Sequence, residues 1–182
     1  MKYTVIIDEC HLERSYEWLY AAMTVNNYIF CSNMASNLPE PFINRCFTLR
    51  LERYTEAELT KIIGLHSRKQ GVTLSDSVLD IISKRSRGTP RTGLFFMLKY
   101  LAMYKPNYNE RTIAAFFHQE GVDRGGFTKL DRQYLGALGT GHRSRRTLQM
   151  LLDVDTLEFD RIEQYLIQQG VVVIESRGRR LA

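Results

Sequence analysis

The chain has 182 residues, 44% of them hydrophobic and 25% charged, and a formal net charge of +5. This length holds one medium domain or two to three small ones, and no apolar run approaches the roughly 20 residues of a membrane-spanning helix. The first apolar stretch has no signal-peptide cleavage site after it, and the three cysteines form no C-x-x-C pair. A membrane protein, a secreted disulfide framework and a cysteine-bound metal are therefore not expected, and a reducing cytoplasm is favoured.

In the first fifty residues, short apolar runs alternate with a helical pattern. Tyr3–Ile7 and Tyr28–Cys31 are predicted to be buried strands, with a helix over Glu13–Met23 between them. Two prolines open a short helix, after which Cys46–Leu51 is predicted to be a third strand. Strands separated by helices favour a parallel sheet.

The next stretch, up to about residue 120, is helical throughout. Thr55 and Glu58 form a capping box, and Ser75 caps a second helix. Thr89 stands as a capping hydroxyl before a proline at the first helical position, where a third helix begins. A fourth, weaker helix is predicted over Asn109–His118.

The remainder begins with the likeliest linker, Gly121–Gly126, which contains two adjacent glycines. Three helical stretches follow, which begin near Thr128, near Ser144 and after Asp155. Gly170 ends the last helix, and two short β-favouring segments then pair as a hairpin. Three helices followed by a hairpin are typical of a winged-helix domain.

Two acids, Asp8 and Glu9, come directly after the first strand. In nucleotide motors this placement lets the first acid hold Mg²⁺, usually through water, because hard cations prefer oxygen ligands. The second acid polarises the water that attacks the γ-phosphate. The plain alternative is a solvated strand end.

Four segments carry a resemblance to a known family. They are the strand with its two acids, Arg85–Arg91, Leu130–Leu135, and Tyr165–Gly170 with the basic stretch after it. In this order they resemble the latter part of the RuvB family, AAA+ ATPases that move Holliday junctions in DNA recombination and repair. The resemblance covers nearly the whole chain.

The resemblance implies an α/β plus mainly α fold, the C-terminal portion of an AAA+ module followed by a winged helix. Residues 1–51 would be the end of the nucleotide-binding domain, with a partial parallel sheet. Residues 52–120 would be the helical lid, and residues 121–182 a winged-helix domain that binds double-stranded or junction DNA. The intact family uses ATP and Mg²⁺ and forms rings of identical subunits.

The resemblance also implies roles for single residues around the nucleotide. Arg45 resembles the arginine finger that a subunit pushes into its neighbour's site. Asn33, after the second strand, resembles the residue that orients the attacking water. Arg91 resembles the arginine that reaches the γ-phosphate of its own subunit, and Tyr54 and Pro90 fall where the cofactor packs. The ordinary alternatives are a surface arginine, a turn asparagine and a packed tyrosine.

The basic C-terminal stretch is predicted to meet DNA. Arg177, Arg179 and Arg180 are close enough in an extended segment to contact consecutive phosphates, which supplies affinity with little sequence choice. An earlier arginine of the family falls on Ile174, so one contact is expected to be missing. A second basic cluster, residues 143–146, is interpreted as a solvated face.

Two departures from the family limit what is expected. The chain has no G-x-x-x-x-G-K-[ST] loop, whose amides and lysine cradle phosphates, so the chain alone is expected to bind ATP weakly or not at all. The family's long hairpin that docks the RuvA partner is also missing, because only four residues connect Met23 to Tyr28. A RuvA contact of the usual kind is therefore not expected, and the chain resembles a divergent, phage-borne relative.

Other readings stay open. Asp8-Glu9-Cys10-His11 matches the box of the DEAD/DEAH helicases, but the other segments of that group are absent. The sequence Asn44-Arg45-Cys46 and the short connection between Met23 and Tyr28 also resemble those of clamp loaders. The leading hypothesis is a RuvB-like branch-migration motor of which this chain is a piece. The alternatives are a non-catalytic DNA-binding module and a subunit that gives Arg45 in trans to a complete neighbour.

Overall fold

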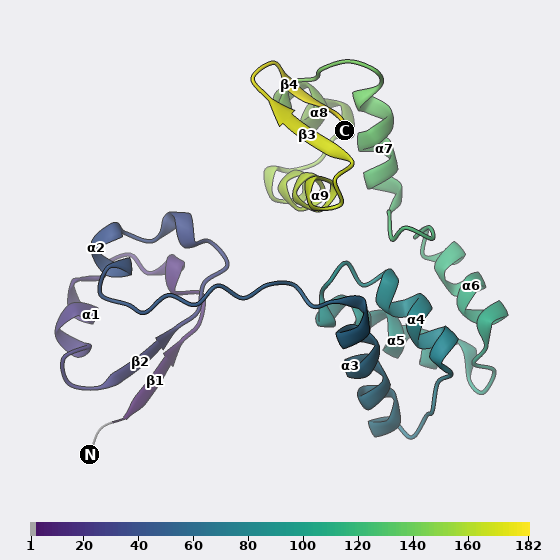
Figure 1. Ribbon diagram of the computed structural model, residues 1–182, viewed down its shortest axis with the longest axis horizontal. Helices are drawn as coiled ribbons and strands as arrows, with labels where there is room; N and C mark the ends of the chain where they lie inside the picture. Colours follow the sequence, from purple (N-terminus) through teal and green to yellow (C-terminus); the bar gives the residue numbers. More distant parts are fainter. Residues whose placement is uncertain (1–2) are drawn as a thin grey trace. The chain divides into compact units, whose positions relative to one another are not determined.

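The computed structural model describes residues 3–182 (Figure 1). The chain divides into two compact units, Met1–Glu52 and Arg53–Ala182. No helix among the described residues is long and apolar enough to cross a membrane.

The first unit is a two-stranded sheet with short helices. Its elements are β1 (Thr4–Ile7), the 3₁₀ helix η1 (Cys10–Leu12), α1 (Glu17–Ala22), β2 (Asn27–Phe30), the 3₁₀ helix η2 (Ala35–Asn37) and α2 (Glu40–Ile43). The strands pair in parallel, as predicted, from Thr4 opposite Asn27 to Ile7 opposite Phe30. The prediction that both strands are buried is wrong, because exposed and half-buried residues alternate along each of them. The core behind them is formed by Cys10, Leu19 and Phe42.

The predicted third strand, Cys46–Leu51, is wrong. Residues 47–51 have no regular structure, and the side chains of Phe47, Leu49 and Leu51 are 89%, 74% and 91% exposed. A strand needs a neighbour for its backbone hydrogen bonds, and none of residues 3–182 pairs with this segment. The helix predicted over Glu13–Met23 is also shorter than expected.

The second unit begins with four helices. These are α3 (Glu56–Lys69), α4 (Asp76–Lys84), α5 (Pro90–Tyr104) and α6 (Glu110–Gln119), and they enclose one aromatic and aliphatic core. Thr55 closes the predicted capping box with Glu58, and the Ser75 hydroxyl accepts from the Val78 amide. The predicted cap at Thr89 is wrong, because its hydroxyl donates to the Arg87 carbonyl instead of capping α5.

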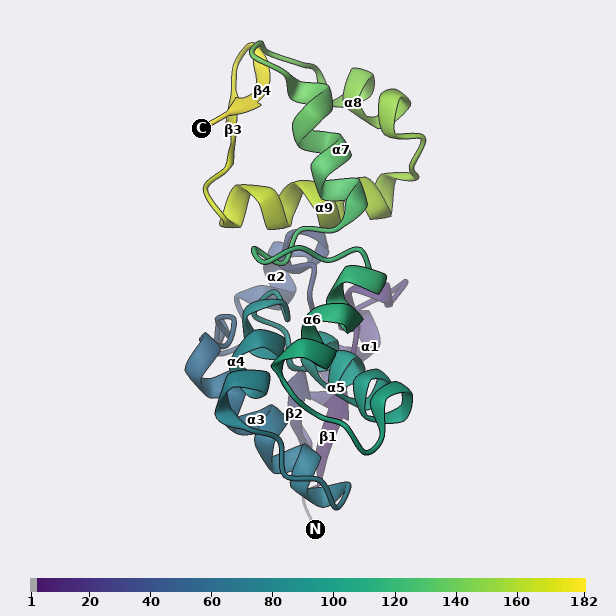
Figure 2. The same cartoon turned by 90° about the vertical axis from the view of Figure 1, so that its right-hand side faces the viewer.

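The unit ends with three helices and a hairpin. The elements are α7 (Lys129–Leu138), α8 (Arg145–Leu152), α9 (Thr156–Gln168), β3 (Val172–Glu175) and β4 (Gly178–Leu181). They have a core of their own, separate from that of α3–α6. Figure 2 shows the hairpin, α7 and α8 gathered on one side of α9. The elements are those predicted, whereas the domain boundary near residue 120 stays a prediction, since both cores lie in one compact unit.

The hairpin has a third backbone partner. Val172 lies opposite Leu181 within it, and on the other side of β4 Arg143 and Arg179 exchange two backbone hydrogen bonds of 2.9 and 2.8 Å. We call β3, β4 and the turn Ser176–Arg177 between them the wing.

Candidate functional site

The acids and the asparagine of the first unit lie at one edge of the sheet. The strands are parallel, and the ladder continues past them through Cys31 N–H to Ile7 O and Cys10 N–H to Cys31 O, both 2.9 Å. Asp8 and Glu9 therefore leave the sheet at the same edge as Asn33. All three side chains are exposed.

His11 links the two loops at this edge, which the sequence did not indicate. Its Nδ1 lies 3.4 Å from Glu9 Oε2 and 3.1 Å from Ser32 Oγ. Glu9 has a left-handed backbone (φ 50°), and its amide donates to Asp8 Oδ1 at 2.9 Å. Among residues 3–182 no group of three or more His, Cys, Asp and Glu side chains converges as metal ligands would. The edge offers oxygen ligands of the kind that Mg²⁺ prefers, but phosphates or waters would have to complete the shell.

Arg45 packs against its own unit. Its Nη1 donates to the Pro41 carbonyl at 2.5 Å, and its guanidinium lies 4.6 Å from the centre of the Tyr20 ring. The residue is nevertheless exposed, which leaves further N–H groups of the guanidinium open to solvent.

The residues predicted to hold the cofactor, Tyr54, Pro90 and Arg91, all belong to the second unit. Gly88, in the loop that leads to α5, has a φ of +69°, and a Cβ there would lie 3.1 Å from the Arg53 Cβ and 3.5 Å from the Tyr54 carbonyl. Arg53 Nη1 donates to the Arg87 carbonyl at 2.6 Å. The backbone of Tyr54 therefore adjoins the loop that precedes α5. That helix begins at Pro90 and carries the exposed Arg91 in its first turn. Asp8, Glu9, Asn33 and Arg45 belong to the other unit.

The turn of the wing presents Arg177 to solvent. The residue is exposed, and within the described part of the chain its guanidinium makes no ion pair and no hydrogen bond. The next residue has to be glycine, because Gly178 has a φ of +127° and a Cβ there would lie 2.5 Å from the Arg143 carbonyl oxygen. The order Arg177-Gly178-Arg179 thus serves the close approach of two backbones.

Arg179, which the sequence analysis predicted to contact DNA, points inward and pairs with Glu163. Its Nε donates to Glu163 Oε1 at 2.7 Å and its Nη2 to Glu163 Oε2 at 3.1 Å, while Tyr134 donates to the same carboxylate at 2.8 Å. The side chains of Arg179 and Glu163 are only 17% and 7% exposed. This two-pronged pair uses two of the five N–H donors of the guanidinium.

The pKa shifts of this cluster have the directions of a charged pair. Burial by itself would raise the pKa of the Glu163 carboxyl, but the hydrogen bonds from Arg179 and Tyr134 outweigh it and hold that pKa below its usual range. Burial, followed by the hydrogen bond to Glu163, raises the pKa of the Tyr134 hydroxyl, and the bond to Glu163 raises the pKa of Arg179. Glu163 lies among the buried apolar residues of α9, between Phe159 and Leu166. An acid at such a position in the sequence indicates a buried carboxylate, which needs a cation as its partner.

Arg180 makes a weaker, exposed pair. Its Nε donates to Glu175 Oε1 at 2.6 Å, and His142 Nε2 lies 3.1 Å from the other oxygen of that carboxylate. These hydrogen bonds, first from His142 and then from Arg180, lower the pKa of Glu175. Exposed pairs contribute little free energy, so Arg180 can exchange Glu175 for another anion.

The structure brings one more arginine to the wing. Arg143, interpreted from the sequence as part of a solvated cluster, is exposed and pairs through its backbone with Arg179. Arg145 instead binds Asp160 at 2.7 Å and lies over the Phe159 ring. The beginning of α9 carries acids, Asp155, Glu158 and Asp160, so that the positive charge gathers at the wing and not on this helix.

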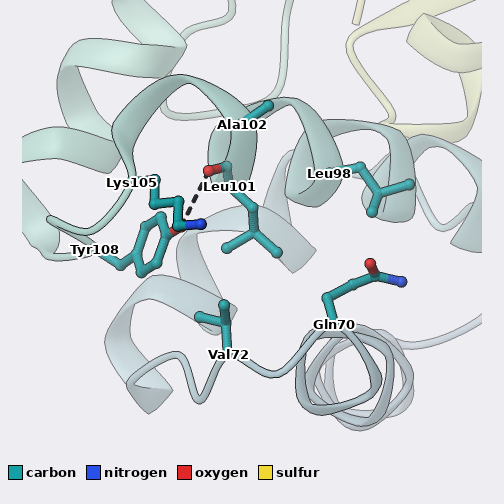
Figure 3. A pocket seen from close by; sticks show the side chains of 7 residues that line it. All are labelled: Gln70, Val72, Leu98, Leu101, Ala102, Lys105 and Tyr108. Carbon is teal, nitrogen blue, oxygen red and sulfur yellow. Dashed lines mark hydrogen bonds between the residues drawn. The ribbon is translucent and has the colours of Figure 1, made fainter.

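A hollow among the helices of the second unit contains none of the predicted site residues (Figure 3). It has a volume of about 270 Å³, and the Tyr108 hydroxyl donates to the Leu101 carbonyl at its wall, 3.0 Å away. The hollow is lined by Gln70, Val72, Leu98, Leu101, Ala102, Lys105 and Tyr108. These side chains offer no converging acids or cations for catalysis.

No family model matches the chain. Over 159 residues it is 33% identical to the Holliday junction branch migration complex subunit RuvB of Rubrobacter xylanophilus, which covers 78% of this chain and 43% of the relative. Over 143 residues it is 37% identical to the same subunit of Gluconobacter oxydans, which covers 73% of this chain and 41% of the relative. The chain therefore spans about two fifths of the length of these curated relatives.

The fold is similar to that of a solved relative. The Thermotoga maritima RuvB Holliday junction branch migration motor matches with a TM-score of 0.82 at 26% identity, over 98% of this chain and 66% of that one. The match confirms the resemblance drawn from the sequence and the predicted fold class: a partial parallel sheet, a helical lid and a winged helix.

Proposed function

We propose that this RuvB-like chain grips the DNA backbone through its wing and acts in the cytoplasm as part of an ATP-driven motor that moves four-way junctions in recombination and repair. One observation carries the DNA contact: the turn of the wing presents a solvent-exposed Arg177 on a hairpin that Glu163 and Arg179 fix to α9. The motor is supported by the relatives, which are branch migration subunits.

The distribution of charge favours contacts to phosphate over contacts to bases. Arg177 in the wing and Arg143 beside β4 are both exposed, and Glu175, the acid that pairs with Arg180, is exposed as well. The acids at the start of α9 would repel a nearby phosphate. Contacts to phosphate carry no sequence information, which suits a motor that has to pass over any sequence.

The salt dependence of DNA binding tests this proposal. Each phosphate neutralised contributes about 0.9 to the slope of log K against log salt for duplex DNA. For Arg177→Ala we expect weaker binding to duplex and four-way-junction DNA and a slope smaller by about one. Arg161→Ala removes the same charge from the exposed face of α9 and should change neither quantity. An Arg177→Ala variant with the affinity and slope of the unmodified chain would refute the wing contact.

For the nucleotide, we propose that the chain supplies only part of a binding site. Asp8, Glu9 and Asn33 fit a role around Mg²⁺ and the attacking water, while Tyr54, Pro90 and Arg91 fit contacts to the base and the γ-phosphate. The chain has no phosphate-binding loop with its lysine, so we expect the chain alone to bind ATP weakly or not at all and not to hydrolyse it. Micromolar ATP affinity in calorimetry would contradict this.

In a ring of similar subunits, Arg45 could reach the nucleotide of the neighbouring subunit. The alternative function is therefore a non-catalytic DNA-binding or clamp-loader-like subunit that lends Arg45 in trans. The exposure of Arg45 favours keeping this alternative. It is tested by adding the chain to a complete RuvB protein whose own finger arginine has been replaced. ATP hydrolysis restored by the chain but not by its Arg45→Ala variant would support it, and no restoration by either would exclude it.

A further inference from the structure

Two arginines that follow α4 reach from the lid helices into the winged-helix part. Arg87 has a left-handed backbone (φ 55°), and its Nε donates to the Gly126 carbonyl at 3.2 Å. Its Nη2 binds the Asp131 carboxylate, and its guanidinium lies 4.1 Å from the centre of the Tyr165 ring. One side chain therefore contacts the connecting loop, α7 and α9 together.

Asp131 makes this contact more than a surface pair. Its side chain is fully buried, and Oδ2 also accepts from the Thr128 amide at 2.5 Å and the Thr128 hydroxyl at 2.7 Å as part of the cap of α7. Its other oxygen, Oδ1, is buried with no hydrogen-bond partner among the described residues. A buried carboxylate depends strongly on its cation, and Arg87 is the cation that reaches it.

The connecting loop itself is held on both sides. Arg85 Nε donates to the Asp123 carbonyl at 2.9 Å, and the Tyr165 hydroxyl donates to the Gly125 carbonyl at 3.2 Å. At Gly126 (φ +78°) a Cβ would lie 3.1 Å from the Tyr165 hydroxyl and 3.4 Å from the Lys84 carbonyl. Gly125 and Gly126, the adjacent glycines of the predicted linker, therefore lie against the end of α4 and against α9.

We propose that Arg87 is a positioning residue that joins the lid and the winged-helix part into one rigid body. Arg87 and Arg91 belong to the same short loop and helix start. A displacement of Arg91 by nucleotide would therefore be passed to α7 and α9, and with them to the wing. This consequence rests on the proposed function, whereas the joint itself does not.

Residual dipolar couplings of the full chain test the joint without nucleotide or DNA. In the unmodified protein one alignment tensor should fit the amides of residues 56–119 and 129–181 together. Arg87→Ala should require two different tensors. Arg124→Ala, an exposed arginine of the same loop, is the matched control and should keep one tensor.

Two results would overturn the proposal: two tensors in the unmodified protein, or a single tensor in Arg87→Ala. The two cores are separate, so each part should keep its fold in that variant, and the circular dichroism spectrum checks this. If Arg87→Ala does not fold, Arg87→Lys replaces it. Lysine keeps the charge but cannot serve Gly126 and Asp131 as a planar fork, so it should also require two tensors.

DNA binding separates this proposal from the proposed function. The wing and its fixing pair are untouched in Arg87→Ala, so its DNA affinity should match that of the unmodified chain. Loss of DNA binding in Arg177→Ala combined with a single tensor for Arg87→Ala would refute the joint alone. If the unmodified chain has one tensor and Arg87→Ala requires two, but the unmodified chain does not bind DNA, the proposed function alone is refuted.

Discussion

Replacement of Glu163 by glutamine is the sharpest test of how the wing is held. The change keeps the size of the side chain but removes the charge that faces Arg179. Breaking a buried ion pair from one side costs about 3–5 kcal/mol, and we expect about 3 kcal/mol, since glutamine still accepts one hydrogen bond. Arg179 also keeps 17% of its side chain exposed, which softens the loss.

The assay has to report on the winged-helix part. The single tryptophan, Trp18, lies in the other unit, so its fluorescence does not serve. Amide hydrogen exchange of the core residues Tyr134, Phe159 and Leu166 reports on the winged-helix part. A loss of about 3 kcal/mol corresponds to exchange roughly a hundredfold faster or more, because every 1.4 kcal/mol is tenfold. Glu158→Gln, on the exposed side of the same helix, should change exchange far less.

The pH dependence gives this prediction a second signature. The pKa of Glu163 is lowered in the folded protein, so its contribution is fully present above the unfolded value of about 4.3. It is lost as the pH falls through the folded pKa. The difference in stability between the unmodified chain and Glu163→Gln should therefore be constant near neutral pH and shrink below about pH 4. Equal exchange rates for the two proteins at pH 7 would refute the reasoning.

Three further predictions concern single positions. Gly178→Ala should destabilise the winged-helix part by about 1–3 kcal/mol in urea unfolding followed by circular dichroism, because of its positive φ and the clash with Arg143. An unchanged midpoint would contradict the geometry of the wing. Gly136→Ala lies within α7 with open space around it and should stabilise the protein by about 0.5–1 kcal/mol in the same assay, whereas a loss would indicate a hidden contact. Arg143→Ala should reduce the salt slope of DNA binding by about one without a change in stability, and an unchanged slope would remove it from the interface.

The helices of the second unit could be predicted because their signals are local. Thr55, Ser75 and Asp155 accept hydrogen bonds from the first turns of their helices, as their residue types indicated. The glycine and the β-favouring residues after α9 likewise placed the hairpin. Such elements are fixed by residues a few positions apart, which a single sequence displays.

What could not be predicted depends on residues far apart in the chain. Residues 46–51 have the composition of a strand, but a strand forms only where another strand offers its backbone. The basic stretch gave no reason to separate Arg177 from Arg179, and only the position of Glu163 among apolar neighbours decides which of them turns inward. The loop at Gly121–Gly126 has the composition of a linker, but Arg85 and Arg87, which lie between α4 and α5, bind its carbonyl groups.

A nuclear magnetic resonance titration of the ¹⁵N-labelled chain with a short DNA duplex tests most directly whether the wing meets DNA. The account predicts that the amides of residues 176–178 and of Arg143 shift with added duplex, and that the shifts diminish as salt is raised. Shifts confined to the exposed face of α9 or to the lid helices, with an unmoved wing, would contradict it.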